Sequence, residues 1–364
     1  MPGKRIRYAV VGLGHIAQVA VLPAFANARR NSELIAIVSG DRTKRHELAK
    51  RYRLHHAFTY DEFDECLTKV DAVYIALPNS MHAEYTIRAA KAGVHVLCEK
   101  PMAVTSRECR QMITACRRAG VKLMVAYRLH FEPATVAAIE RVRNGELGEA
   151  HLFTSTFAQM VDPANHRAKT EAAGPVLDMG PYPVNAARNL FGAEPTDVSA
   201  FGSRHTNSGL GDFDDTVTVM LRFPGGKLAH FVVSYFGNAI DAYTVLGTKG
   251  SLEVQPGYTY GKSLEHFLTI GEKKDNDSYK NTDQFGGEMK YFSDCILNDL
   301  DPEPDAEEGF ADVRVLEAIQ RSLQTGEVQK LGPFVRSRHI DPDQVVRLGA
   351  LKPPEPLRAS SPDR

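Results

Sequence analysis

The sequence predicts an α/β protein with two domains. The first is expected to be a doubly wound parallel sheet, and the second an α+β domain with a large, mainly antiparallel open sheet. Three observations support this. A glycine-rich turn follows the first apolar run. Apolar strand-like runs and helix-like segments then alternate about five times, which favours a parallel sheet. After Tyr127 the pattern changes to one long helical segment and then mainly extended segments.

The first element is an apolar run over residues 8–11, typical of a buried parallel strand. It is followed by Gly-x-Gly-x-x-Ala at positions 12–17. Glycine permits a tight turn and close approach of a pyrophosphate, and the small alanine permits close packing of helix on strand. A helix is predicted over residues 15–28, kinked or interrupted by Pro23, and its first N–H groups favour a phosphate. This pattern indicates a dinucleotide-binding Rossmann domain whose pyrophosphate contacts are Gly12, Gly14, His15 and Ile16.

The second strand, over residues 33–39, determines the choice of cofactor. A carboxylate at its end would accept hydrogen bonds from the ribose hydroxyls of NAD and repel a 2′-phosphate. The strand ends instead at Ser39, and cations follow in the next helix, which Asp41 or Thr43 would cap. NADP is therefore predicted over NAD, with Ser39 and Lys44 holding the 2′-phosphate. Asp41 leaves NAD open if the strand runs longer. The residues assigned to this end of the cofactor are Ser39, Gly40, Arg42 and Lys44.

The remaining elements of the first domain follow the same alternation up to residue 126. The strands are predicted to end in short polar motifs, where ligands bind in parallel sheets. In chain order we expect a connection with a short helix at 58–67, a strand at 70–79 ending in Leu77-Pro78-Asn79, a helix at 81–92 closed by Gly93, a strand at 94–101 ending in Glu99-Lys100-Pro101, a helix at 106–119 ended by Gly120, and a strand at 121–126.

The second domain is expected to combine helices on one face with a wide sheet. A hairpin signal lies at residues 223–226. The other face of so large a sheet needs cover, which predicts a homo-oligomer, a dimer or tetramer, formed through this sheet. The predicted domain limits are 4–126, 127–335 and a C-terminal arm at 336–364. The helices are expected at 132–144 and 309–324, and the extended segments at 149–159, 197–204, 215–223, 227–236 and 243–254.

Bulk properties exclude several classes of function. Lys and Arg number 44 against 45 Asp and Glu, a net charge of −1, so nothing points to nucleic acid or an acidic membrane as partner. No apolar run is long enough to span a bilayer, and the first strand begins too early to leave room for a signal peptide. The five cysteines lack the spacing of metal sites or disulfides, which predicts no metal and a cytoplasmic protein.

Four motifs taken together resemble one family. They are the glycine turn, Leu77-Pro78-Asn79 with His82, Glu99-Lys100-Pro101, and Asp178-x-x-x-Tyr182, and their order is that of the Gfo/Idh/MocA oxidoreductases. The resemblance covers roughly residues 5 to 330 and is strongest to the glucose–fructose and aldose–aldose oxidoreductase branch. It implies an NADP-dependent sugar (aldose) oxidoreductase that moves a hydride between a nicotinamide and a sugar carbon. In that branch the cofactor stays bound and is recycled by a second sugar.

The resemblance also assigns roles to Lys100, Asp178 and Tyr182. Lys100 would lie beside the reacting carbon, and Pro101 restrains the backbone at Lys100. Asp178 and Tyr182 are one helical turn apart and can face the same cleft. Tyr182 would be the acid/base, and Lys100 would hydrogen-bond the same substrate oxygen and lower the tyrosine pKa. Asp178 would orient the lysine or the substrate hydroxyl and balance charge. Without the resemblance, Lys100 reads equally well as a surface lysine paired with Glu99.

The resemblance adds further cofactor contacts but departs from the family's pattern at His166 and Pro175. Those departures leave the substrate open. The alternatives are a conventional NAD(P)-dependent inositol or sugar dehydrogenase, or a catalytically silent cofactor-binding sensor. Retention of all three catalytic candidates argues against the sensor. The further contacts implied are Leu77, Pro78, Asn79, His82, Glu99, Lys100, Arg128 and Arg167.

Overall fold

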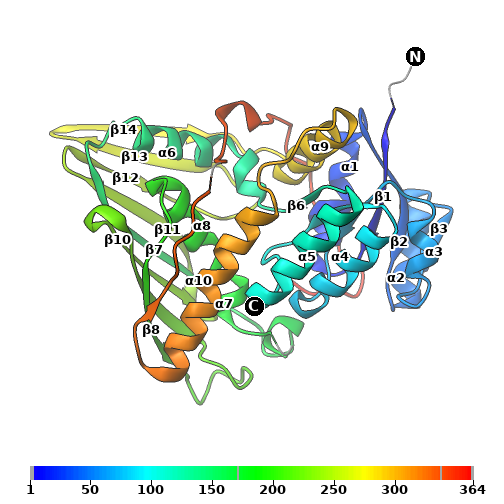
Figure 1. The fold of residues 1–364 in the computed structure, drawn as a ribbon, viewed down its shortest axis with the longest axis horizontal. Coiled ribbons are helices and arrows are strands. Elements are labelled where there is room, and N and C mark those ends of the chain that lie inside the picture. The colour runs from blue at the N-terminus through cyan, green and yellow to red at the C-terminus, as the bar shows by residue number, and fades with distance from the viewer. Residues whose placement is uncertain (1–3, 170–171, 337, 362–364) are drawn as a thin grey trace. The chain divides into compact units, whose positions relative to one another are not determined.

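The computed structural model describes residues 4–169, 172–336 and 338–361. The chain forms two compact units, neither of them continuous in sequence (Figure 1). The first unit contains Met1–Phe131, Thr282–Phe310 and Val346–Ser360; the second contains Glu132–Asn281, Ala311–Val345 and Ser361–Arg364. The domain limits expected from the sequence stay a prediction.

The first unit is built on a six-stranded parallel sheet of order β3-β2-β1-β4-β5-β6. This is the Rossmann order, in which ligands bind outside the carboxyl ends of the strands where the strand order reverses, here between β1 and β4. The central strands are largely apolar, as is usual where helices cover both faces of a parallel sheet. The predicted doubly wound sheet is thus confirmed, with strands β1 (Ile6–Val11), β2 (Ser32–Val38), β3 (His56–Phe58), β4 (Ala72–Ile75), β5 (His95–Cys98) and β6 (Leu123–Val125).

Three helices of the first unit, α2, α5 and α9, begin at a residue whose side chain caps them. Helix α5 starts with a capping box between Thr105 and Glu108 and stops at Gly120, which has a φ of 67°. Helix α9, which the sequence analysis did not anticipate, packs on α1 and belongs to this unit. The helices are α1 (Leu22–Ala28), α2 (Arg42–Tyr52), α3 (Phe63–Leu67), α4 (His82–Lys91), α5 (Ser106–Ala119) and α9 (Gln284–Leu297).

The predicted helix over residues 15–28 contains a π-helical segment, η1 (Ala17–Val21), directly before α1. Pro23 lies in the first turn of α1, where its missing N–H costs least. The helix therefore accommodates the proline by widening one turn rather than by ending. Wide turns of this kind recur at functional sites.

The second unit contains a nine-stranded sheet of order β14-β13-β12-β11-β7-β10-β9-β8-β15. All neighbours are antiparallel except β7 and β10, which run parallel. This confirms the mainly antiparallel sheet and the hairpin between β9 and β10. The strands are β7 (Ala150–Met160), β8 (Asp197–Ser203), β9 (Thr216–Arg222), β10 (Leu228–Ser234), β11 (Phe236–Gly247), β12 (Gly250–Val254), β13 (Leu264–Ile270), β14 (Lys273–Tyr279) and β15 (Gln329–Lys330).

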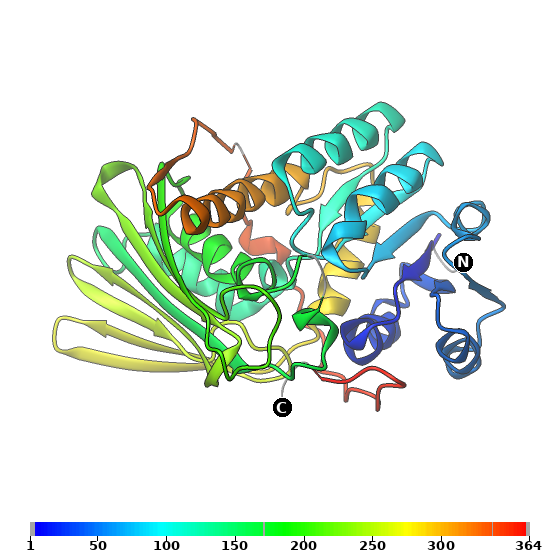
Figure 2. The same ribbon diagram turned by 90° about the horizontal axis from the view of Figure 1, so that it is seen from below.

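Helices cover one face of this sheet, and Figure 2 shows no helix on the other face among the described residues. The covering helices are α6 (Pro133–Arg143), α8 (Pro181–Phe191) and the part of α10 (Ala306–Thr325) within the second unit. Strand β14 was not anticipated because its sequence, KKDNDSY, is polar and lacks the alternation of a half-buried strand. Among the described helices, none has the length and apolar character needed to cross a membrane.

Candidate active site

The glycine turn between β1 and the first helix leaves room for a ligand. Gly12 has a φ of 94°, and a Cβ there would lie 2.4 Å from the carbonyl oxygen of Ala76, so only glycine fits. Its N–H donates to the carbonyl of Val38 at 2.9 Å. At Gly14, by contrast, a Cβ would meet nothing within 4 Å. The turn thus draws the ends of β1, β2 and β4 together and leaves open space beside the helix start, which fits the pyrophosphate of a dinucleotide.

The end of β2 presents a serine rather than a carboxylate. The strand stops at Val38 and Ser39 is buried. Asp41 is the N-cap of α2, and its Oδ1 accepts a hydrogen bond from the backbone N–H of Lys44 at 3.0 Å. That carboxylate is therefore engaged in capping the helix. Lys44 is half-buried, and burial lowers its pKa.

The ends of β4 and β5 are joined by the buried imidazole of His82. Its Nδ1 lies 2.9 Å from the carbonyl oxygen of Pro101, and its Nε2 lies 2.9 Å from that of Leu77. Burial lowers the pKa of this ring. The ring thus lies between the carbonyl of Pro101, the residue after Lys100, and the carbonyl of Leu77 in the Leu77-Pro78-Asn79 loop. This geometry makes His82 a positioning residue, and its direct contact with a cofactor stays a prediction.

Beside Lys100, Glu99 is part of a buried acidic network. The hydroxyl of Tyr74 lies 2.8 Å from Glu99 Oε1 and 2.9 Å from Glu288 Oε1. One hydroxyl proton cannot serve two carboxylates, so one of the acids must carry a proton of its own. Burial, followed by the charge of Glu99, raises the pKa of Glu288 well above its usual value. We assign the extra proton to Glu288, which then donates to Tyr74, while Tyr74 donates to Glu99.

Replacing Glu288 by glutamine is expected to remove one pH dependence of stability. The folded protein keeps a proton on Glu288 that the unfolded chain, with an ordinary carboxyl pKa of 4.5, releases. Wild-type stability therefore falls as pH rises above about 4.5, by about 1.4 kcal/mol per pH unit from this group until its folded pKa is reached. Urea unfolding of both proteins is measured between about pH 5 and pH 8. The free energy of unfolding of the variant should rise relative to that of the wild type as the pH increases. Glu47→Gln, at an exposed position, is the control, and its free energy of unfolding should depend on pH as that of the wild type does. The same pH dependence in Glu288→Gln and in the wild type would refute the assignment.

Arg128 begins the short helix η3 (Arg128–Phe131) and is buried. Its Nη1 donates to Oε1 of Gln284, the first residue of α9. The guanidinium carbon lies 6.0 Å from the centre of the Phe285 ring. Arg128 is thus held by α9, and its contact with the cofactor stays a prediction.

In the second unit, two short helices position Asp178 and Tyr182. Helix α7 (Pro175–Asp178) ends at Asp178, and α8 begins three residues later. A Cβ at Gly180, between them, would lie 2.2 Å from the carbonyl oxygen of Val176. The single helix start expected from the sequence is therefore two helices with a close turn between them.

Asp178 is held by two donors that come from different parts of the chain. Arg167 Nη1 lies 2.8 Å from its Oδ2, and the hydroxyl of Tyr235 donates to the same oxygen at 2.7 Å. Tyr235 is fully buried, and burial raises its pKa well above the usual value, so it stays a donor. Arg167, predicted as a cofactor contact, thus pairs with Asp178 within this unit. Tyr235 has no motif around it and was missed by the sequence analysis.

The ring of Tyr182 packs among aromatic side chains. Its centre lies 5.4 Å from that of Phe157, edge to face, and 5.6 Å from that of Tyr258. Tyr258 is itself fixed by a 2.8 Å hydrogen bond between its hydroxyl and that of Ser155. The sheet thereby holds the Tyr182 ring while leaving the residue partly exposed.

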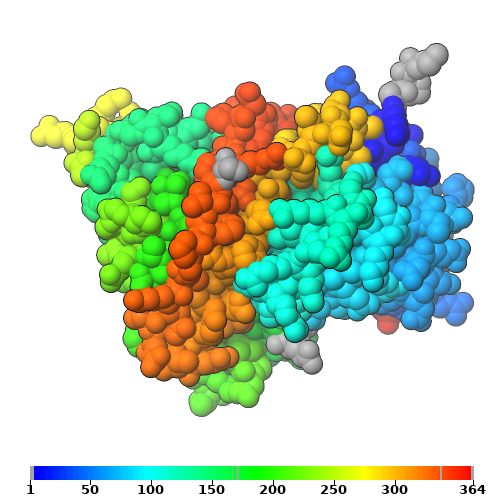
Figure 3. All heavy atoms as spheres, in the orientation of Figure 1, coloured from blue at the N-terminus to red at the C-terminus, as the bar shows by residue number. Residues whose placement is uncertain are grey.

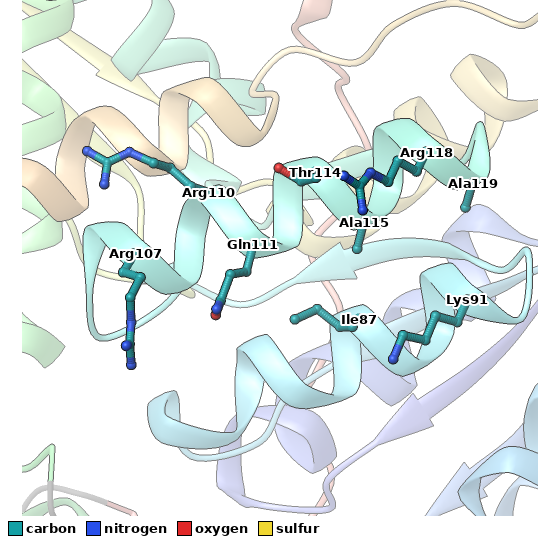
Figure 4. Close-up of a pocket in the computed structure, with 9 residues that line it drawn as sticks. All are labelled: Ile87, Lys91, Arg107, Arg110, Gln111, Thr114, Ala115, Arg118 and Ala119. Atoms are coloured by element: carbon teal, nitrogen blue, oxygen red, sulfur yellow. The ribbon is translucent and has the colours of Figure 1, made fainter.

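A separate hollow lies between α4 and α5 in the first unit. These helices form the light-blue and cyan surface of Figure 3, and Figure 4 shows the hollow itself. None of the residues assigned above to the cofactor or to catalysis lines it. Its lining residues are Ile87, Lys91, Arg107, Arg110, Gln111, Thr114, Ala115, Arg118 and Ala119.

Comparison with known proteins agrees with this description. A model of the oxidoreductase family with an NAD-binding Rossmann fold matches residues 6–127, and a model of the GFO/IDH/MocA C-terminal domain matches residues 135–253. The chain is 31% identical over 338 residues to an NADP⁺-dependent D-xylose 1-dehydrogenase of Haloarcula marismortui, covering 90% of this chain and 93% of that protein. It is 30% identical to a second D-xylose 1-dehydrogenase (NADP⁺), from Haloferax volcanii, covering 89% and 99% of the two chains.

A solved structure extends the likeness to three dimensions. Aldose–aldose oxidoreductase from Caulobacter crescentus, crystallised with glycerol, superposes with a TM-score of 0.85 at 36% identity. The match covers 90% of this chain and 100% of that one. With both of its domain models matched as well, this chain belongs to the Gfo/Idh/MocA family of oxidoreductases.

Proposed function

We propose that this protein is an NADP-dependent sugar oxidoreductase that transfers a hydride between a nicotinamide and an aldose carbon bearing a hydroxyl or carbonyl oxygen. The observation that carries the cofactor assignment is the serine at the end of β2, with Asp41 used as a helix cap and Lys44 beside it. The NADP⁺-dependent xylose dehydrogenases and the aldose–aldose oxidoreductase support the sugar substrate.

The residues of this chain would divide the work as follows. The glycine turn would hold the pyrophosphate, and bound NADP would supply or accept the hydride. Tyr182 would take the proton from the sugar hydroxyl during oxidation and return it during reduction. Lys100 would donate a hydrogen bond to the same oxygen and stabilise its developing negative charge. Asp178, held by Arg167 and Tyr235, would orient the substrate hydroxyl.

We further propose that NADP stays bound and is recycled by a second sugar. Nucleotide released from freshly purified protein by denaturation should be NADP at nearly one per chain. Adding one aldose to the native protein should raise the absorbance of reduced nicotinamide in a single turnover, and adding a second sugar should reverse it. Protein that is purified empty and turns over steadily with added NAD would instead favour a conventional inositol or sugar dehydrogenase. Bound NADP that no aldose reduces would favour the sensor.

We also propose that the uncovered face of the nine-stranded sheet joins two copies of the chain, in the cytoplasm, where the five buried free cysteines stay reduced. Apolar side chains on alternate positions of five strands point away from the core on this face. They are Phe201, Met220, Leu228, Ile240, Leu246 and Phe267, with exposed fractions between 36% and 69%.

The double substitution Phe201→Ser with Met220→Ser is expected to convert the oligomer to single chains, because it removes apolar area from that face on the neighbouring strands β8 and β9. Light scattering on the eluted protein measures the mass directly. Val328→Ser, which changes an exposed valine outside the sheet face, is the control and should leave the mass unchanged. A wild-type protein that already elutes as one chain contradicts the proposal.

A further inference from the structure

A short piece of the C-terminal segment lies on the dinucleotide-binding part of the first unit. We call residues 355–358 the C-terminal strap. Arg51, near the end of α2, donates from Nη1 to the carbonyl oxygen of Glu355 at 3.2 Å. Arg358 donates from Nη1 to the hydroxyl of Thr43, in the first turn of α2, at 3.0 Å. In Figure 2 this segment is the red loop beside the dark-blue helices. The strap is thus attached to α2, which follows the end of β2.

The strap is also attached to the glycine turn through Gln18. The side-chain oxygen of Gln18 accepts from the backbone N–H of Leu357 at 2.8 Å, and its Nε2 donates to the Leu357 carbonyl at 3.0 Å. The same Nε2 donates to the carbonyl of Leu13, between the two glycines, at 2.9 Å. Gln18 is fully buried, and both hydrogens of its amide are used. The Gln18 side chain therefore links the strap by hydrogen bonds to the turn that would hold the pyrophosphate.

Arg358 brings a positive charge to the end of β2. Its Nη1 lies 3.5 Å from Oδ1 of Asp41, the cap of α2. A carboxylate at this place would repel a 2′-phosphate, and Arg358 offsets that charge. Its charge also acts on Lys44, where it contributes to the lowered pKa after burial. The side chain of Arg358 is more than half exposed while it makes these contacts, which leaves it accessible to a ligand.

We propose that Arg358 completes the binding site for the 2′-phosphate of NADP and that the strap holds the adenosine end of the cofactor in place. The proposal rests on the NADP preference proposed above and names a specificity residue that lies more than three hundred positions from the glycine turn. Arginine suits a phosphate because its planar fork can donate two parallel hydrogen bonds. Because the strap bridges α2 and the glycine turn, it would also slow the departure of any bound dinucleotide.

Binding of cofactor fragments tests the specificity role without any turnover. Full-length protein freed of nucleotide on charcoal is titrated calorimetrically with 2′,5′-ADP and with 5′-ADP, which differ only in the 2′-phosphate. Arg358→Gln should weaken 2′,5′-ADP about tenfold or more and change 5′-ADP less than about twofold. Arg358→Lys, which keeps the charge, should lie between wild type and Arg358→Gln. Lys352→Gln, the same charge change at an exposed position on the same segment, should leave both affinities unchanged.

Displacement kinetics test the retaining role of the strap. Leu357→Pro removes the backbone N–H that donates to the side-chain oxygen of Gln18, and it leaves the sequence of the glycine turn unchanged. Stopped-flow displacement should then show NADP and NAD both leaving several times faster, whereas Arg358→Gln accelerates NADP selectively. Equal effects of Arg358→Gln on the two fragments, or unchanged dissociation in Leu357→Pro, would overturn the assignment. A wild-type protein that binds 5′-ADP as tightly as 2′,5′-ADP would overturn the NADP preference itself, and the strap's specificity role with it.

Discussion

Replacing Lys100 by methionine is expected to lower kcat by about a hundredfold to ten-thousandfold, the usual contribution of a group that stabilises or transfers a proton in the transition state. Methionine keeps the length of the stem and removes the ammonium. Lys100 follows β5 at the carboxyl edge of the parallel sheet, and the His82 ring contacts the backbone carbonyl of the next residue, Pro101. The lost interaction acts on the developing oxygen charge, so the affinity for NADP should change less than about threefold.

Steady-state kinetics with the best aldose and a fluorescence titration with NADP provide the two measurements. Lys69→Met, at an exposed position before β4, is the matched control and should retain wild-type kcat. A Lys100→Met variant with kcat within twofold of wild type contradicts the assigned role. A variant that loses NADP affinity in proportion to kcat would make Lys100 a cofactor ligand instead.

Replacing Tyr182 by phenylalanine is expected to have an effect of similar size, since it removes the proton carrier and nothing else. Phenylalanine keeps the ring that packs edge to face on Phe157 and beside Tyr258, so the fold should be unaffected. The pH profile of kcat discriminates this role from a structural one. The limb that reports the acid/base group in the wild type should disappear, and the residual activity should become nearly independent of pH.

Tyr279→Phe, on β14, is the control and should retain both the rate and the shape of the profile. The double variant Lys100→Met, Tyr182→Phe should be little slower than the worse single variant, because the two residues would act on one oxygen. Multiplicative losses would show that they act independently. An unchanged pH profile in Tyr182→Phe would assign the acid/base role to another group.

The sequence predicted those elements whose patterns are local. The apolar runs of five of the six parallel strands, the capping residues of α5 and the glycine turn all lie within windows of about ten residues, and the structure has each of them, whereas the three-residue strand β3 was not predicted. Other elements were missed, among them β13, although its sequence LEHFLTI alternates between buried and less buried positions. Strand β14 is polar along its length, and α9 joins the first unit although it follows the whole sheet of the second in the chain. The local sequence around α9 does not indicate that this helix packs in the first unit.

The candidate site divides in the same way. Lys100, Asp178 and Tyr182 are flagged by short motifs, and their roles stay predictions that the variants above test. Their supports carry no motif. Glu288 reaches Tyr74 across 214 positions, and Tyr235 reaches Asp178 across 57. Each is a buried polar group, and such groups are retained only where folding supplies a hydrogen-bonding partner.

The choice between NADP and NAD shows what each level determined. By itself the sequence determined that a serine and not a carboxylate lies at the end of the second strand and that cations follow, but it left Asp41 ambiguous. Only the tertiary structure decided that Asp41 caps α2, because a cap depends on the backbone geometry that ends the strand one residue before Ser39. Likewise, only the tertiary structure brought Arg358 next to the Asp41 carboxylate and to Thr43, which lies 315 residues earlier in the chain. Charges separated so widely along the chain interact only when packing elsewhere brings them within a few ångströms.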